Sequence, residues 1–141
     1  MCDISEHNHL IRYCKPWQVD ERTKFPTSLI FELRDKLKDG NIEEYLSCNW
    51  FEYRECNIDI ILEDLKVRMK VSTKGCNALI SIYKLKEIVK KYDTKVKIKY
   101  LGKEIDSYSG IYPIPRNSFK NYRLQRDLLK SIEKIFEIKN R

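Results

Sequence analysis

The chain has 141 residues, a formal net charge of +7, 42% hydrophobic residues and 35% charged residues. This length suits one domain with a sizeable core, and this composition excludes a disordered chain. The longest apolar runs are only a few residues, far below the roughly 20 residues of a membrane span, and the acids and histidines near the start leave no signal-peptide pattern. We therefore expect one domain over residues 1–141, located in the cytoplasm, with residues 1–8 as a flexible tail.

The first part of the chain reads as short strands separated by polar loops. The segment "LIRYC" (10–14) predicts a strand, and "SLIFELR" (28–34), which alternates and is rich in β-forming residues, predicts another. A polar loop bounded by two prolines (15–26) lies between them, and Asp39-Gly40 indicates a tight turn after the second strand.

The stretch after residue 56 has the period of a helix. Its apolar residues recur on one stripe: Ile58, Ile61, Leu62, Leu65 and Met69. Asn57 is placed to cap the start of this helix, and Asp59 is favourable at the positive end of the helix dipole.

Three further elements follow in order. The segment "ALISIY" (78–83) predicts a buried strand, "KLKEIVKKY" (84–92) a short helix, and "TKVKIKYLG" (94–102) an alternating strand. The alternating strand has an apolar side, formed by Val96, Ile98 and Tyr100, and a basic side, formed by Lys95, Lys97 and Lys99.

The end of the chain predicts one long amphipathic helix, from Asn117 or Ser118 to about Ile138. Its apolar arc consists of Leu124, Leu128, Leu129, Ile132, Ile135 and Phe136. The opposite face is basic and consists of Lys120, Arg123, Arg126, Lys130 and Lys134. Together these elements predict an α+β fold, in which a small mixed β-sheet is packed on one side by two or three helices.

The cysteines and histidines do not predict a metal or disulfide site. The cysteines are five in number and form no C-x-x-C pair: Cys2, Cys14, Cys48, Cys56 and Cys76. This pattern favours reduced, buried thiols. His7 and His9 would need further ligands, such as Cys2 and Cys14, and no zinc spacing supports that set. We expect no metal site and no cofactor.

The densest segment is "EEYLSCNWFEY" (43–53). Tyr45, Leu46, Trp50 and Phe51 carry large apolar side chains that are typical of a core or an interface. We interpret the segment mainly as a wall of the core. The alternative is a pocket beside Trp50, in which Ser47, Asn49 and Glu52 present polar groups over an aromatic floor.

Catalysis by acids would require at least two converging carboxylates. The candidates are Glu43, Glu44, Glu52, Glu55 and Asp106, and their spacing is not that of a metal-dependent nuclease. The chain also lacks a P-loop, a dinucleotide-binding fingerprint and a G-x-S-x-G motif. We therefore expect a non-catalytic protein, and a small metal-dependent nuclease or nucleotide hydrolase using Glu52, Glu55 and a lysine remains the alternative.

The same dense segment carries a resemblance. "EEYLSCNWFEY" is similar to a Y-L-S-V-N-W-L-E signature of small bacterial proteins without an assigned activity, and three further segments resemble them in the same order: "LIRYCKPWQVD" (10–20), "TSLIFELRD" (27–35) and "SYSGIYPIP" (107–115). Those proteins often read S-H-A-G-I in the last segment, with a histidine in place of Tyr108. The resemblance implies a bacterial or phage-borne single-domain protein and, by analogy, an accessory subunit of a multi-gene system such as an antiviral one.

The charge is segregated along the chain. Residues 1–64 carry 8 Lys and Arg against 14 Asp and Glu, whereas residues 65–141 carry 20 against 7. This asymmetry predicts that the basic C-terminal half binds a polyanion, either nucleic acid or an acidic protein surface. We expect an accessory or adaptor protein with these binding residues: Lys95, Lys97, Lys99, Lys120, Arg123, Arg126, Lys130 and Lys134.

Overall fold

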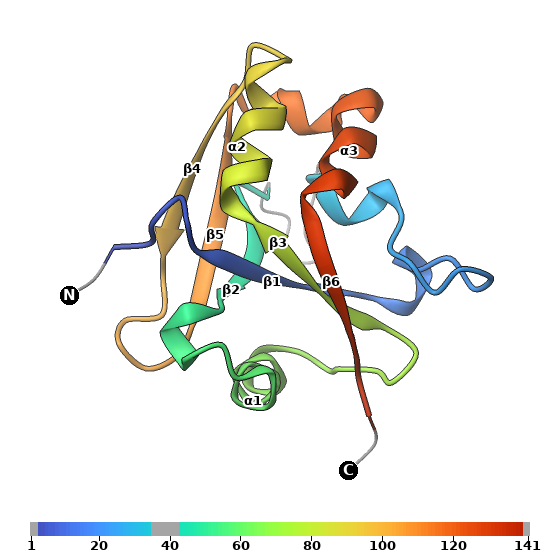
Figure 1. Cartoon of the computed structure of the whole chain (residues 1–141), viewed down its shortest axis with the longest axis vertical. Helices are drawn as coiled ribbons and strands as arrows, with labels where there is room; N and C mark the ends of the chain where they lie inside the picture. The colour runs from blue at the N-terminus through green and yellow to red at the C-terminus, as the bar shows by residue number, and fades with distance from the viewer. Residues whose placement is uncertain (1–2, 35–42, 140–141) are drawn as a thin grey trace.

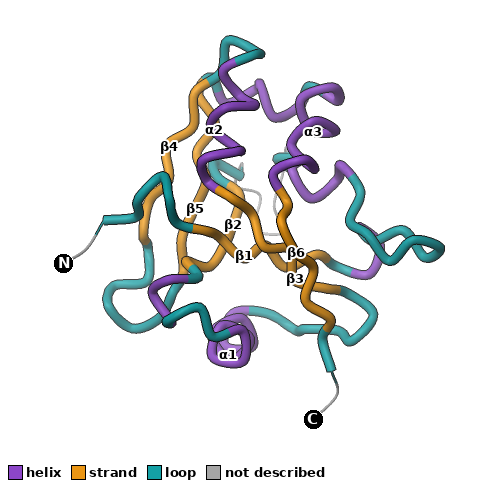
Figure 2. The backbone as a smooth tube through the Cα atoms, viewed as in Figure 1, coloured by secondary structure: helices purple, strands orange, loops and turns teal. Residues whose placement is uncertain are grey.

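A computed structural model describes residues 3–34 and 43–139, which fold around a six-stranded sheet (Figure 1, Figure 2). Its strands are β1 (His9–Cys14), β2 (Leu46–Trp50), β3 (Cys76–Ser81), β4 (Lys95–Tyr100), β5 (Tyr108–Ile114) and β6 (Ile132–Glu137). Their order across the sheet is β4-β5-β2-β1-β3-β6, and all neighbours are antiparallel.

The α+β class is confirmed, but the prediction of a mixed sheet is wrong. The α-helices are α1 (Ile58–Arg68), α2 (Ile82–Lys90) and α3 (Tyr122–Leu128). Although α2 follows β3 directly and precedes β4, these two strands are not neighbours, because β1, β2 and β5 lie between them. The segment β3-α2-β4 therefore connects two strands on different sides of the sheet, and these strands form no parallel pair. No helix of the described chain is long and apolar enough to span a bilayer.

Helices cover both faces of the sheet, whereas the sequence predicted one covered face. Leu10 and Cys14 of β1 pack in the cluster that contains residues of α2 and α3, while Ile11 and Tyr13 pack in the cluster that contains residues of α1. This division follows from the alternation of side chains along a strand. Figure 1 shows α2 and α3 together at the top and α1 separately at the bottom.

The long C-terminal helix is not present. The chain instead forms the 3-10 helix η4 (Arg116–Lys120), α3, the 3-10 helix η5 (Leu129–Ser131) and the edge strand β6. Asn121 caps α3, because its side-chain oxygen accepts hydrogen bonds from the backbone N–H groups of Arg123 and Leu124.

A bulge in β6 explains why its sequence resembles a helix. The register between β3 and β6 shifts at Leu79/Ile80 and leaves Glu133 without a residue opposite it. An extra residue of this kind reverses the alternation of faces. Ile132 and Ile135, which are three residues apart, therefore both pack against the core on the α2/α3 side. The bulged strand thus reproduces the apolar spacing that otherwise indicates a helix.

The predicted strand over residues 28–34 is also absent. Ser28–Phe31 form the 3-10 helix η2, with Ile30 and Phe31 fully buried. The backbone carbonyl of Ile30 accepts a hydrogen bond from the Arg12 side chain rather than from a neighbouring strand. The predicted turn at Asp39-Gly40 lies outside the described residues.

The predicted helix that starts at Ile58 and the predicted helix over residues 84–92 are present as α1 and α2. The predicted strands over residues 10–14, 78–83 and 94–102 are present as β1, β3 and β4, with bounds shifted by one or two residues, whereas β2 and β5 were not predicted as strands. Asn57 caps α1 by accepting hydrogen bonds from the backbone N–H groups of Asp59 and Ile60. The residues of β4 alternate between exposed lysines and partly buried apolar side chains. The first strand is confirmed and extends by one residue, so that His9 lies in β1.

A buried carboxylate fastens α1 to the sheet. Asp64 accepts hydrogen bonds from the backbone N–H and the hydroxyl of Ser107, at 3.1 and 2.6 Å, and forms an ion pair with Arg54 at 2.9 Å. Burial opposes ionisation of Asp64, but the bonds from Arg54 and Ser107 outweigh it and lower the pKa of this carboxyl. The charged form of Asp64 is thus stabilised where α1 meets the start of β5.

Most of the cysteines are buried and none forms a disulfide among the described residues. Cys14, Cys48 and Cys76 are buried, whereas Cys56 is exposed, which contradicts its predicted burial. Cys14 and Cys76 lie opposite one another on β1 and β3. Cys2 lies outside the described residues.

The interpretation of the segment 43–53 as a wall of the core is confirmed for Leu46, Trp50 and Phe51, whereas Tyr45 is only half-buried. Trp50 and Phe51 are 5% and 8% exposed, and Leu46 is fully buried. The Trp50 ring packs beside the rings of Tyr53 and Tyr100, with centroids 5.6 and 5.7 Å away. Trp50 therefore packs β2 against Tyr53, which follows β2 in the chain, and against Tyr100 of β4.

We predict that Trp50→Ala lowers the free energy of unfolding by about 3–5 kcal/mol, because a large side chain is removed from a packed core. Urea denaturation measures this change. The matched control is Trp17→Ala, since Trp17 is 62% exposed and a surface substitution changes stability by about 0.5 kcal/mol or less. Equal effects of the two substitutions would contradict a core role for Trp50.

Candidate functional site

The predicted basic residues do not form one surface. Lys95, Lys97 and Lys99 are exposed on β4, whereas Lys134 is exposed on β6, and these two strands are the opposite edges of the sheet. Lys99 lies over the ring of Tyr112, with its Nζ 4.9 Å from the ring centroid. The basic half of the sequence is therefore divided among separate parts of the fold.

Four of the predicted basic residues lie in α3 and the 3-10 helices next to it in the chain. Lys120 lies in η4, Arg123 and Arg126 in α3, and Lys130 in η5, and all four are exposed. We call these four residues the α3 basic face. Lys130 forms an ion pair with Asp127 at 3.6 Å, while Arg123 and Arg126 form none within the described chain. Leu124 and Leu128, on the other side of α3, are fully buried.

The four predicted pocket residues lie in two different places. Ser47 and Asn49 line a cavity, whereas Trp50 lies in the core and Glu52 binds His9. Asn49 is buried and its amide donates a hydrogen bond to the hydroxyl of Ser107 at 2.8 Å. The segment 43–53 is therefore both a wall of the core and one side of a cavity, because its alternate residues face opposite sides of β2.

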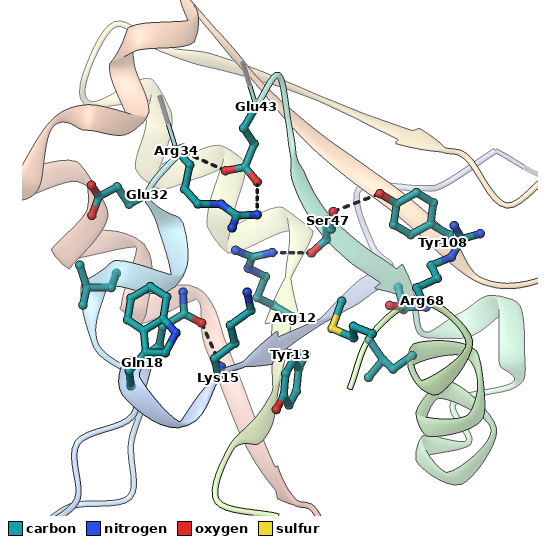
Figure 3. A pocket seen from close by; sticks show the side chains of 15 residues that line it. Arg12, Tyr13, Lys15, Gln18, Glu32, Arg34, Glu43, Ser47, Arg68 and Tyr108 are labelled. Atoms are coloured by element: carbon teal, nitrogen blue, oxygen red, sulfur yellow. Dashed lines mark hydrogen bonds and ion pairs between the residues drawn. The ribbon is translucent and has the colours of Figure 1, made fainter. Parts of the chain in front are cut away.

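The cavity forms where β1 and β2 separate. These strands pair only at Leu10–Trp50 and Ile11–Asn49, although β1 stays paired with β3 as far as Cys14. The Arg12 guanidinium spans the gap and donates to the backbone carbonyls of Ser47 and Ile30, at 2.7 and 3.0 Å. Figure 3 shows Arg12 between the two diverging strands.

The cavity has a volume of about 270 Å³. Its lining includes four basic residues, Arg12, Lys15, Arg34 and Arg68, and two carboxylates, Glu32 and Glu43. Three aromatic residues also line it: Tyr13, Trp17 and Tyr108. We call it the Arg12 cavity.

Two of its basic side chains are held by acids. Arg34 forms an ion pair with Glu43 at 3.3 Å, and Arg68 forms one with Asp106 at 2.8 Å. The Arg68 guanidinium also lies 3.9 Å from the centroid of the Tyr108 ring, a favourable cation–π geometry. Arg12 differs from both because no carboxylate of the described chain bonds to it.

Tyr108 is the residue that the predicted resemblance would align with a histidine. Its hydroxyl is hydrogen-bonded to the hydroxyls of Tyr45 and Ser47, at 2.9 and 3.1 Å. Tyr108 lines the Arg12 cavity, so this position lies at the cavity wall. The other lining residues outside α1 and Met69 come from segments 10–20, 27–35 and 43–53.

The sequence analysis missed a cluster around His9. The His9 ring is bonded through Nδ1 to Glu52 and through Nε2 to Glu133, both at 2.7 Å, and Glu133 also pairs with Lys84 at 3.2 Å. Burial of His9 opposes its charge, but the bonds to the two carboxylates outweigh it and raise the pKa of His9 above its ordinary value of 6.5. No motif in the sequence could reveal this cluster, because its members are separated by tens of residues.

The residues proposed for the enzymatic alternative do not converge. Glu52 is bonded to His9, Asp106 to Arg68 and Glu43 to Arg34, while Glu55 is exposed. Within residues 3–34 and 43–139, no group of three or more His, Cys, Asp and Glu side chains is arranged to hold a metal ion. Glu52, Asp106 and Glu43 therefore serve as partners of basic side chains in this fold.

Comparison with known proteins adds no assignment. The sequence matches no known family, and no curated protein or solved structure matches it either. The resemblance to the small bacterial proteins therefore stays a prediction, and the site must be interpreted from its own geometry.

We predict that the His9 cluster makes stability depend on pH. Because the pKa of His9 is raised in the folded state, its contribution is fully present below the unfolded pKa, about 6.5, and is lost as pH rises through the folded pKa. In urea denaturation between pH 5 and 9, the stability difference between the natural protein and His9→Gln should shrink as pH rises. His7→Gln is the control, since His7 is exposed; a difference that grows with pH would contradict a protonated His9.

Proposed function

We propose that this protein is a non-catalytic adaptor that binds nucleic acid through the α3 basic face. The observation that carries the proposal is that Arg123 and Arg126 are exposed and form no ion pair within the described chain, on a helix whose other side is buried. Exposed cations of this kind are available to phosphate groups, and each contact releases counter-ions from the nucleic acid.

Nucleic acid fits this face better than an acidic protein surface. A specific protein interface has an apolar centre surrounded by polar residues. The one large apolar side chain that α3 exposes is Tyr122, which is 62% exposed and lies beside Arg123. A single aromatic ring among basic residues suits stacking on a base together with contacts to phosphates.

The cellular setting is proposed on the resemblance alone. The similarity to small bacterial proteins supports a subunit of a cytoplasmic multi-component system, of which an antiviral system is one type. No observation favours the alternative of a metal-dependent nuclease or nucleotide hydrolase, because each carboxylate named for it is either exposed or bonded to a basic residue.

We predict that the triple substitution Arg123→Glu, Arg126→Glu and Lys130→Glu abolishes nucleic-acid binding and leaves the melting temperature nearly unchanged. In the three corresponding single variants, which keep the other contacts, the slope of log affinity against log salt should fall by roughly 0.7–0.9 each, because this is the contribution of one phosphate contact. Electrophoretic mobility shifts or fluorescence anisotropy at two salt concentrations measure both effects.

The matched control is Lys95→Glu, Lys97→Glu and Lys99→Glu. It changes the net charge by the same amount but acts on β4, at an edge strand away from α3. Equal loss of binding in both variants would indicate a general charge effect. Full binding by the α3 variant would contradict the proposal, and loss of an acidic protein partner without loss of nucleic acid would assign the face to that partner.

A further inference from the structure

Arg12 carries a charge that no carboxylate within residues 3–34 and 43–139 pairs with. Its side chain is partly buried, and the hydrogen bonds that it makes within the described chain go to the carbonyls of Ile30 and Ser47. A guanidinium has five N–H donors, so these two bonds leave most of them unused. Charged groups withdrawn from water are normally paired. Arg12 therefore presents an unpaired, positioned donor to the Arg12 cavity.

The cavity offers other donors near this guanidinium. The side-chain oxygen of Gln18 accepts the backbone N–H of Lys15 at 2.9 Å, so the Gln18 amide nitrogen, which makes no hydrogen bond within the described chain, remains as a donor. The hydroxyls of Ser47 and Tyr108 also line the cavity, but they bond to each other, and Tyr108 also bonds to Tyr45, so at most one of the two has a hydrogen left to donate. The carboxylate of Glu43 is held by Arg34. A planar, bidentate donor supported by neutral donors matches a phosphate group.

The rim of the cavity is apolar and aromatic. Trp17 lines it and is 62% exposed, and Leu29 lines it and is 38% exposed. An exposed indole next to an anion site is a surface on which a nucleobase stacks. The volume of about 270 Å³ is near the lower limit of ligand pockets and suits one nucleotide rather than a dinucleotide.

We infer that the Arg12 cavity binds one 5′-phosphorylated nucleotide, with its phosphate on Arg12 and its base on Trp17. The nucleotide is either free or the 5′ end of a strand, since both present the same phosphate and base. This site is separate from the α3 basic face, and its evidence does not depend on the proposed function.

The first experiment measures binding by titration calorimetry and by acrylamide quenching of tryptophan fluorescence. The chain has two tryptophans, of which Trp17 is 62% and Trp50 is 5% exposed, so quenching reports mainly on Trp17. We expect the four 5′-nucleoside monophosphates to bind at least tenfold more tightly than the matching nucleosides or inorganic phosphate, and to shield Trp17 from acrylamide.

Variants then separate the two halves of the ligand. Trp17→Ala should weaken nucleotide binding on the order of tenfold, as expected for the loss of one stacked base, and leave the binding of inorganic phosphate unchanged. The matched control is Tyr122→Ala, because Tyr122 is equally exposed at 62% and lies on α3.

Arg12→Lys keeps the charge but not the planar fork of the guanidinium, so it should weaken the binding of both nucleotide and phosphate about tenfold. Its matched control is Arg22→Lys in the exposed loop, which should weaken neither.

Two further arms identify the source of the ligand and separate the proposals. A 5′-phosphorylated oligonucleotide that competes with the mononucleotide, while its 5′-hydroxyl counterpart does not, assigns the site to a strand end; competition by the mononucleotide alone assigns it to a free nucleotide. The triple substitution on α3 should leave mononucleotide binding intact.

The inference is overturned if nucleotides fail to bind saturably, if nucleosides bind equally well, if Trp17→Ala has no effect, or if a peptide carboxylate displaces the nucleotide at lower concentration.

Discussion

The Arg12 guanidinium holds together the place where the sheet opens. β1 is a central strand and keeps its full pairing with β3, but it leaves β2 after two residue pairs. Beyond that point the Arg12 side chain donates hydrogen bonds to the backbone carbonyls of Ser47 on β2 and Ile30 on η2. One side chain thus fixes the spacing of three segments, and the Arg12 cavity exists because a side chain rather than a strand fills the gap.

The two covered faces of the sheet stabilise this opening from both sides. The larger cluster, with α2, α3 and η2, holds the apolar side of β1 and β2. On the other face, α1 is fastened through Asp64 to Ser107, and Ser107 in turn receives the amide of Asn49. These buried bonds fix α1 against the sheet. The end of α1, where Arg68 lies, is thereby held beside the cavity that Arg68 lines.

Several local features could be predicted from the sequence and the candidate site could not. The cap at Asn57, the alternation in β4 and the burial of Trp50 follow from the residue itself and its near neighbours. The binding residues were expected along the basic half of the sequence, but the fold separates Lys95 from Lys134 onto opposite edges. The cavity residues come from both halves of the sequence, because sheet pairing brings together segments that are far apart in the chain.

The sequence by itself determined the α+β class, the start of α1, the two-sided character of β4 and the core role of the segment 43–53. Each of these depends on a short repeat of apolar residues or on a contact between residues a few positions apart, and such local features can be recognised in the sequence. Only the tertiary structure decided the bulge at Glu133, which gives a strand the apolar spacing of a helix, and the pairing of His9 with Glu52 and Glu133. It also decided where β1 and β2 separate at Arg12. The place where two strands stop pairing depends on all the segments packed around them, and no single segment of the sequence reveals it.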